Sequence, residues 1–98
     1  MLDLTPEQIS TVRMITAEYL DPSTNIYAFG SRTNGKARQY SDLDLLIKSD
    51  KAVPYKTLTE LENAFSESDL PFMTDIIDWQ QITEEFRTAI SKQLVKLN

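Results

Sequence analysis

The chain has 98 residues but only two glycines, and both lie in one polar loop, which constrains the fold more than any other feature. Gly30 and Gly35 are five residues apart, and the loop separates two short apolar runs, 26–29 and 45–47. Apolar runs of this length next to glycine turns are typical of buried strands. We therefore expect a strand, a glycine turn, a polar loop and a second strand.

Two aspartates open the second of these strands. Asp42 and Asp44 are two residues apart, so on a strand their side chains lie on the same face. Two adjacent carboxylates repel each other unless a cation lies between them, and oxygen ligands of this kind suit Mg²⁺. The turn at Gly30 and Ser31 offers backbone N–H groups and a hydroxyl to an anion. The stretch therefore predicts a site for a metal ion and a nucleotide.

The whole loop carries a recognisable pattern. Residues 30–45 read Gly-Ser-x3-Gly-x5-Ser-Asp-x-Asp-Leu. This pattern resembles the signature of the nucleotidyltransferase superfamily related to DNA polymerase β. The short chain is similar to the minimal nucleotidyltransferases, the MNT proteins, which are usually paired with an all-helical HEPN protein. The resemblance extends from the first strand to the segment Asp75-x-x-Asp78-Trp79.

The resemblance implies a role for each polar residue of the site. Asp42 and Asp44 are implied as ligands of two Mg²⁺ ions, and Asp75 as the third carboxylate, nearest the acceptor hydroxyl. The phosphates of a nucleoside triphosphate would be bound by backbone N–H groups and polar side chains of the loop. The implied phosphate-binding residues are Gly30, Ser31, Arg32 and Ser41.

Several residues keep an alternative interpretation, and Ser41-Asp42 could simply begin a turn. Arg32 either pairs with the acidic cluster or binds a phosphate. Asp78, three residues beyond Asp75, would face the other side of a strand, and it fits a helix cap better than a metal ligand. Ser31 could instead be an ordinary cap, and Asp75 a surface residue on an edge strand.

The remaining periodicity predicts an α/β (α+β) fold: a small mixed sheet of three strands, or alternatively four, with helices packed on it. If the glycine turn and the aspartate pair share one site, the first two strands are antiparallel. For Asp75 to join them, the third strand must run parallel to the second, with a helix as the right-handed crossover. One nucleotidyltransferase domain over 1–98 is expected, in the order α-β-α-β-α-β-α. The expected helices are 5–20, 34–39, 54–68 and one from residue 83 onward. The expected strands are 25–29, 43–48 and 72–77, with residues 95–98 frayed.

Composition excludes several classes of chemistry. The chain contains no cysteine and no histidine, so disulfides, thiolate metal sites and a histidine base are excluded, and carboxylates must supply the chemistry. The net charge of −5 argues against stable binding to nucleic acid, which needs a basic face. No apolar run approaches the ~20 residues of a membrane span, and the acidic N-terminus lacks a signal-peptide pattern. A cytoplasmic protein is the expectation.

Two functions from different classes remain. The first is a Mg²⁺-dependent nucleotidyltransferase that moves a nucleoside monophosphate to a hydroxyl. The resemblance implies AMP from ATP, a tyrosine of a HEPN partner as the acceptor, and an antitoxin role. The alternative is a binding module that neutralises or supports a helical partner by complex formation alone.

Overall fold

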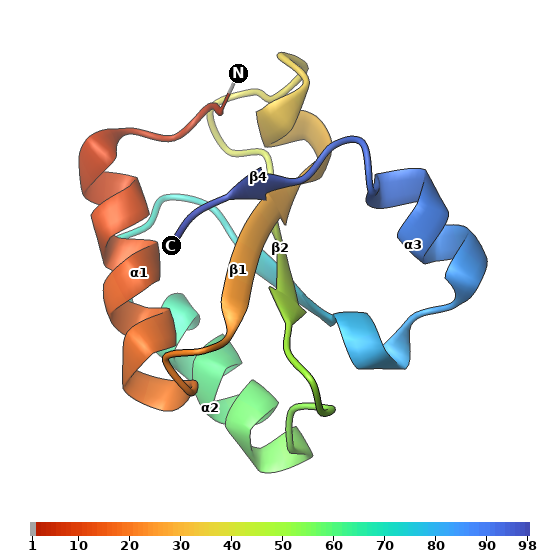
Figure 1. Cartoon of the computed structure of the whole chain (residues 1–98). Coiled ribbons are helices and arrows are strands. Elements are labelled where there is room, and N and C mark those ends of the chain that lie inside the picture. Colours follow the sequence, from red (N-terminus) through yellow and green to blue (C-terminus); the bar gives the residue numbers. More distant parts are fainter. Residues whose placement is uncertain (1) are drawn as a thin grey trace.

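The computed structural model describes residues 2–98, and Figure 1 shows a sheet with helices on both faces. Helices α1 and α2 lie on one side, and α3 lies on the other. The helices are α1 (Pro6–Tyr19), α2 (Tyr55–Ser66) and α3 (Glu84–Ile90), with short 3₁₀ helices η1 (Gly30–Thr33) and η2 (Trp79–Gln81); the strands are β1 (Asn25–Phe29), β2 (Leu43–Lys48), β3 (Thr74–Asp78) and β4 (Val95–Lys96).

The sheet has four strands in the order β3-β2-β1-β4. Strands β1 and β2 are antiparallel, β2 and β3 are parallel, and β4 is antiparallel to β1. The strand directions inferred from a shared site are therefore confirmed, with α2 as the crossover between β2 and β3. The four-stranded alternative is the correct one.

The first helix begins at a complete capping box. The backbone N–H of Gln8 donates to the Thr5 hydroxyl, and the Thr5 N–H donates to the Gln8 side chain. Pro6 occupies the first turn, where its missing N–H costs nothing. Val12 is fully buried against the sheet. The helix ends at Tyr19, one residue before the predicted end, because Leu20 is already extended.

Alternation along the central strand separates two hydrophobic cores. Leu43, Leu45 and Ile47 belong to the large core under α1 and α2. Leu46 faces the other way and packs with Phe29 and residues around α3. Asp44, which precedes Leu46 by two residues and faces the same side, is half-buried.

Three expectations about element boundaries were wrong. The short helix predicted at 34–39 is instead a 3₁₀ turn at Gly30–Thr33, because Gly35 adopts a positive φ of 77° that interrupts any helix. The third strand runs from Thr74 to Asp78, two residues later than its predicted start. The residues expected to fray, 95–98, are ordered: they contain β4, and Leu97 is 2% exposed.

The backbone of β1 is held at its far edge by the last residues of the sequence. The Ile26 N–H donates to the Asn98 side chain, and Asn98 donates to the Thr24 carbonyl. The Leu97 N–H donates to the Ile26 carbonyl, and the Arg13 side chain donates to the Leu97 carbonyl. Within residues 2–98 no helix is both long and apolar enough to span a lipid bilayer.

Candidate active site

The sheet brings the glycine turn and two of the predicted carboxylates to one end. Phe29 is paired with Asp44, and Gly30 follows directly at the end of β1. On the other side of β2, Asp44 is paired with Asp75 of β3. Asp42 immediately precedes β2, where the Leu43 N–H donates to a carbonyl at the entrance of β3. The glycine turn and Asp75 therefore lie on opposite sides of Asp44.

Gly30 and Asp44 are in direct contact. Gly30 has a φ of +80°, and a Cβ built there would overlap the Oδ2 atom of Asp44. Glycine is required here for two independent reasons: the left-handed backbone and the space taken by the carboxylate. Gly35 also has a positive φ but no atom near its missing Cβ. Only Gly30 therefore serves the site directly.

The carboxylates influence one another electrostatically. Burial raises the pKa of the Asp44 carboxyl, and the negative charges of Asp75 and Asp42 raise it further. The three carboxylates are thus close enough to repel, which is the situation that a bound cation relieves. The donor set consists of hard oxygen atoms, as Mg²⁺ requires.

No three acidic side chains in residues 2–98 form a group that could hold a metal ion by itself. Mg²⁺ in proteins is often bound by one or two carboxylates together with waters and substrate phosphates. Asp44 and its cross-strand partner Asp75 supply carboxylate oxygens of this kind.

The glycine turn has a hydrogen bond that the sequence did not reveal. The Gly30 N–H donates to the Gln93 side chain at 3.1 Å, across 63 residues of sequence. The Thr33 hydroxyl donates to the Gly30 carbonyl at 2.7 Å and closes the 3₁₀ turn. Ser31 lies half-buried in this turn. The phosphate contacts predicted for Gly30 and Ser31 stay predictions.

Arg32 has a structural role that the sequence pattern did not reveal. Its side chain is 4% exposed, and its guanidinium lies 4.0 Å from the centre of the Phe72 ring. It donates to the carbonyls of Asp3, Gln39 and Ser41 at 2.8–3.1 Å. These contacts fix the end of the loop that leads into Asp42. A charged residue in a polar loop gives no sequence signal for such a role, and the predicted phosphate contact stays a prediction.

Ser41 belongs to the same loop anchor. Its hydroxyl accepts from the Arg38 N–H at 2.8 Å, and its N–H donates to the Arg38 carbonyl at 3.1 Å. Its own carbonyl accepts from Arg32. Ser41 therefore closes the turn that precedes Asp42, while the nucleotide contact predicted for it stays a prediction.

Asp78 acts as the cap that its spacing indicated. Its carboxylate accepts from the N–H of Gln80 at 3.0 Å and from the N–H of Val53 at 2.7 Å. The side chain is 4% exposed and lies on the opposite face of β3 from Asp75, which is exposed. Asp78 therefore connects η2 to the segment before α2, away from the candidate site.

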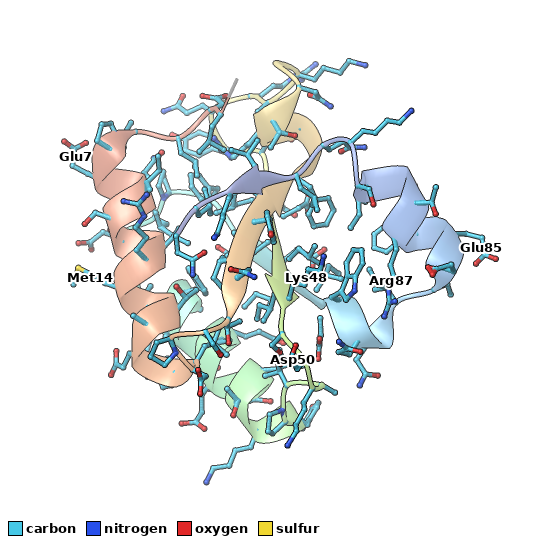
Figure 2. All side chains as sticks on the ribbon, in the orientation of Figure 1. Glu7, Met14, Lys48, Asp50, Glu85 and Arg87 are labelled. Carbon is cyan, nitrogen blue, oxygen red and sulfur yellow. The ribbon has the colours of Figure 1, made fainter. Side chains whose placement is uncertain are left out.

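Trp79 fixes the helices of the second face to the sheet. Figure 2 shows Lys48 and Arg87 on the side of the sheet that α3 occupies. The Lys48 ammonium lies 4.6 Å and the Arg87 guanidinium 4.7 Å from the centre of the Trp79 ring. Arg87 also donates twice to the Trp79 carbonyl. Trp79 is therefore a packing residue, and it connects β2 to α3.

A mixed sheet in this order, with a glycine turn against an acidic central strand, defines the nucleotidyltransferase class of folds. Comparisons with known proteins give the same class. The family model described as polymerase beta, nucleotidyltransferase, matches residues 13–97, and the chain belongs to this family.

A related protein and solved structures indicate which members of the family this chain is similar to. The chain is 44% identical over 94 residues to the probable protein adenylyltransferase MntA of Haemophilus influenzae, covering 96% of this chain and 82% of that protein. A crystal structure of a toxin–antitoxin with AMP-PNP contains a chain with a TM-score of 0.78 at 19% identity, covering 92% of this chain and 72% of that one. The complex of a tri-AMPylated HEPN toxin with its MNT antitoxin from Shewanella oneidensis matches with a TM-score of 0.69 at 20% identity, covering 92% and 68%.

Proposed function

We propose that this chain is a protein adenylyltransferase of the MNT type, which transfers AMP from ATP to a hydroxyl of a helical HEPN partner and thereby acts as its antitoxin. The observation that carries the proposal is the position of Asp44 between the glycine turn and Asp75. The 44% identity to a probable protein adenylyltransferase supports the same chemistry. The toxin–antitoxin structures with AMP-PNP and with an AMPylated HEPN toxin support the substrate and the partner.

Each residue has a physical role in this proposal. Asp42, Asp44 and Asp75 would hold Mg²⁺, which supplies charge neutralisation at the phosphates when bound. Gly30 and Ser31 bind the phosphates that leave as pyrophosphate. Asp75, whose side chain is exposed, accepts the proton of the acceptor hydroxyl. Arg32 keeps the loop in place so that Asp42 stays beside Asp44.

The decisive experiment is a transfer assay with ATP labelled at the α-phosphate, Mg²⁺ and the co-expressed helical partner. We expect label on the partner with the wild-type chain and none with Asp42→Asn/Asp44→Asn. Asp50→Asn is the control, because this exposed acid follows β2 at its other end. The competing binding module predicts a stable complex without transfer, and protection of cells by the double variant that equals protection by the wild type.

A further inference from the structure

The connection between α3 and β4 reaches the glycine turn through the side chain of Gln93. The amide oxygen of Gln93 accepts from the Gly30 N–H at 3.1 Å. Figure 1 shows this connection passing the end of β1 that leads into η1. The two residues are 63 positions apart in the sequence, so this hydrogen bond joins the C-terminal part of the chain to the candidate site.

Other hydrogen bonds keep the Gln93 amide in one orientation. Its Nε2 group donates to the Ala89 carbonyl at 3.4 Å, so that each half of the amide has a partner of the correct kind. The Gln93 backbone N–H donates to the carbonyl of Ile90, which is 3% exposed and packs with Phe29 beside α3. The acceptor that Gly30 meets is therefore attached to a buried part of the protein.

Both backbone polar groups of Gly30 are held by side chains. Gln93 accepts from its N–H, and the Thr33 hydroxyl donates to its carbonyl at 2.7 Å. Glycine samples more backbone conformations than any other residue, so bonds at both of its peptide groups help to select the observed φ of +80°. The position of Gly30 in turn limits where the Oδ2 atom of Asp44 can lie. Gln93 is thus connected to Asp44 through Gly30.

The Gly30 N–H has one hydrogen, and two acceptors compete for it during the reaction. One is the Gln93 oxygen, as in this structure, and the other is a phosphate oxygen of the substrate. In the first case Gln93 holds the turn, and the phosphates are bound on the Ser31 side of it. In the second case Gln93 is a competitor that must leave. The first case is favoured, because displacement would break the bonds of the amide to both Gly30 and Ala89.

We propose that Gln93 is a positioning residue for the transfer reaction. It keeps its hydrogen bond to Gly30 when the nucleotide binds, and it thereby holds the glycine turn against the Asp44 carboxylate. This inference rests on the proposed function. The Gln93 side chain is exposed, and substitutions at exposed positions usually change stability little, so its removal should loosen the turn without unfolding the protein.

The test compares two substitutions of the same kind. Gln93→Met keeps the length of the side chain but removes the acceptor, whereas Gln81→Met makes the same change at an exposed position of η2. Transfer to the helical partner is measured at saturating ATP and Mg²⁺, together with the Kd for ATP. We expect Gln93→Met to lower kcat about tenfold with the KM for the partner unchanged, and Gln81→Met to behave as wild type.

Two results of this assay would overturn the proposal. An unchanged kcat in Gln93→Met would show that the hydrogen bond does not matter for transfer. Tighter binding of ATP by Gln93→Met would identify Gln93 as a competitor of the phosphates, because the loss of a positioning residue does not tighten binding.

A second measurement does not depend on transfer. Gly30 and Gly35 are the only glycines of the sequence, so a sample labelled with ¹⁵N-glycine gives two amide signals, and Gly35→Ala assigns them. Hydrogen exchange of the Gly30 N–H should be about three- to tenfold faster in Gln93→Met than in wild type, with the Gly35 signal as the reference. The difference should persist when Mg²⁺ and a non-hydrolysable ATP analogue are bound. Its loss on nucleotide binding would show that a phosphate has taken the N–H, and would overturn the proposal.

The connection to Asp44 is tested with Mg²⁺. Gln93→Met should reduce the rise in Tm that Mg²⁺ produces in an otherwise wild-type chain, and it should not change the smaller rise in Asp44→Asn. Equal effects of Gln93→Met in the two backgrounds would overturn this connection. If the exchange and Mg²⁺ results are as expected but no AMP is transferred to the partner, the adenylyltransferase is rejected and Gln93 is retained as the residue that positions the turn.

Discussion

The missing side chain of Gly30 would occupy the same space as the Oδ2 atom of Asp44. This relationship joins the end of β1 to the central carboxylate, and it depends on two conditions that only glycine meets: a φ of +80° and no Cβ. The glycine turn therefore determines where the Asp44 carboxylate can lie.

Replacing Gly30 by alanine should reduce the transfer activity much more than the stability of the protein. Gly35→Ala is the matched control, because its φ is 77° but its Cβ would meet no atom within 4 Å. Each substitution should lower the free energy of unfolding by about 1–2 kcal/mol through left-handed backbone strain. Gly30→Ala should also displace the Asp44 carboxylate and reduce transfer by about 100-fold. Denaturant unfolding and the labelled-ATP assay measure the two effects, and equal activity in both variants would contradict the contact.

Removing the charge of Asp44 should stabilise the metal-free protein. Burial and the charges of Asp75 and Asp42 raise the pKa of its carboxyl above the ordinary 3.8. The folded state then holds a proton more tightly than the unfolded state, so this group lowers stability as the pH rises from 3.8 through the raised pKa. Asp44→Asn lacks this titrating group, so its unfolding free energy at pH 7 should exceed that of the wild type. The gain should be at most about 1 kcal/mol, because solvent screens a half-exposed carboxylate. The readout is the difference in unfolding free energy between the variant and wild type from pH 3 to 7.

Mg²⁺ should act on the same carboxylate. Binding to the native state should raise the Tm of the wild-type chain, and the rise should be larger with ATP present, since phosphate oxygens complete the set of ligands. Asp44→Asn should show a smaller rise, whereas Asp50→Asn should match wild type. Equal rises in all three proteins would place the metal ion elsewhere.

Substitutions of the two aspartates of β3 should have different effects: one should reduce stability, and the other should abolish transfer. Asp78→Ala removes the acceptor of two backbone N–H groups, those of Val53 and Gln80, and should cost about 2–4 kcal/mol. Asp75→Ala changes an exposed side chain and should keep the unfolding free energy within about 0.5 kcal/mol of wild type, while transfer is lost. Thermal unfolding and the transfer assay give the comparison. A stable Asp78→Ala protein would show that these hydrogen bonds are dispensable.

Arg32 should prove to be an anchor of the loop. Arg32→Met leaves the carbonyls of Asp3, Gln39 and Ser41 without their donor and should lower stability by about 2–4 kcal/mol. Arg38→Met, at an exposed position in the same loop, is the control and should change stability by less than about 0.5 kcal/mol. If Arg32 instead binds a phosphate, Arg32→Met should bind ATP more weakly and keep the stability of the wild type, and that outcome would contradict the anchor.

Local signals in the sequence were sufficient for most of the fold. Periodicity predicted a helix that starts at residue 5, and uninterrupted apolar runs predicted β1 and β2, because these features act over a few residues. The directions of the strands followed from the assumption that Asp44 and Asp75 share a site. Family resemblance supplied that assumption, which periodicity could not.

The features that were missed depend on contacts between distant residues. Strand β4 has only two residues, so its pattern is too short to distinguish from a frayed helix end. The hydrogen bond from Gly30 to Gln93 joins residues 63 apart. The buried position of Arg32 depends on Phe72 and the first residues of the chain. No local pattern encodes such pairs.

The pairing of β1 with β4 has a consequence for synthesis on the ribosome. Strand β1 emerges early, but the residues that cover its outer edge, Val95 to Asn98, follow about 70 positions later. Until they arrive, a nascent chain exposes an unpaired strand edge, which is a template for association with other chains. Contacts of such long sequence separation also slow folding. The nascent chain is thus most exposed to aggregation after α1, β1 and β2 have formed and before β4 closes the sheet.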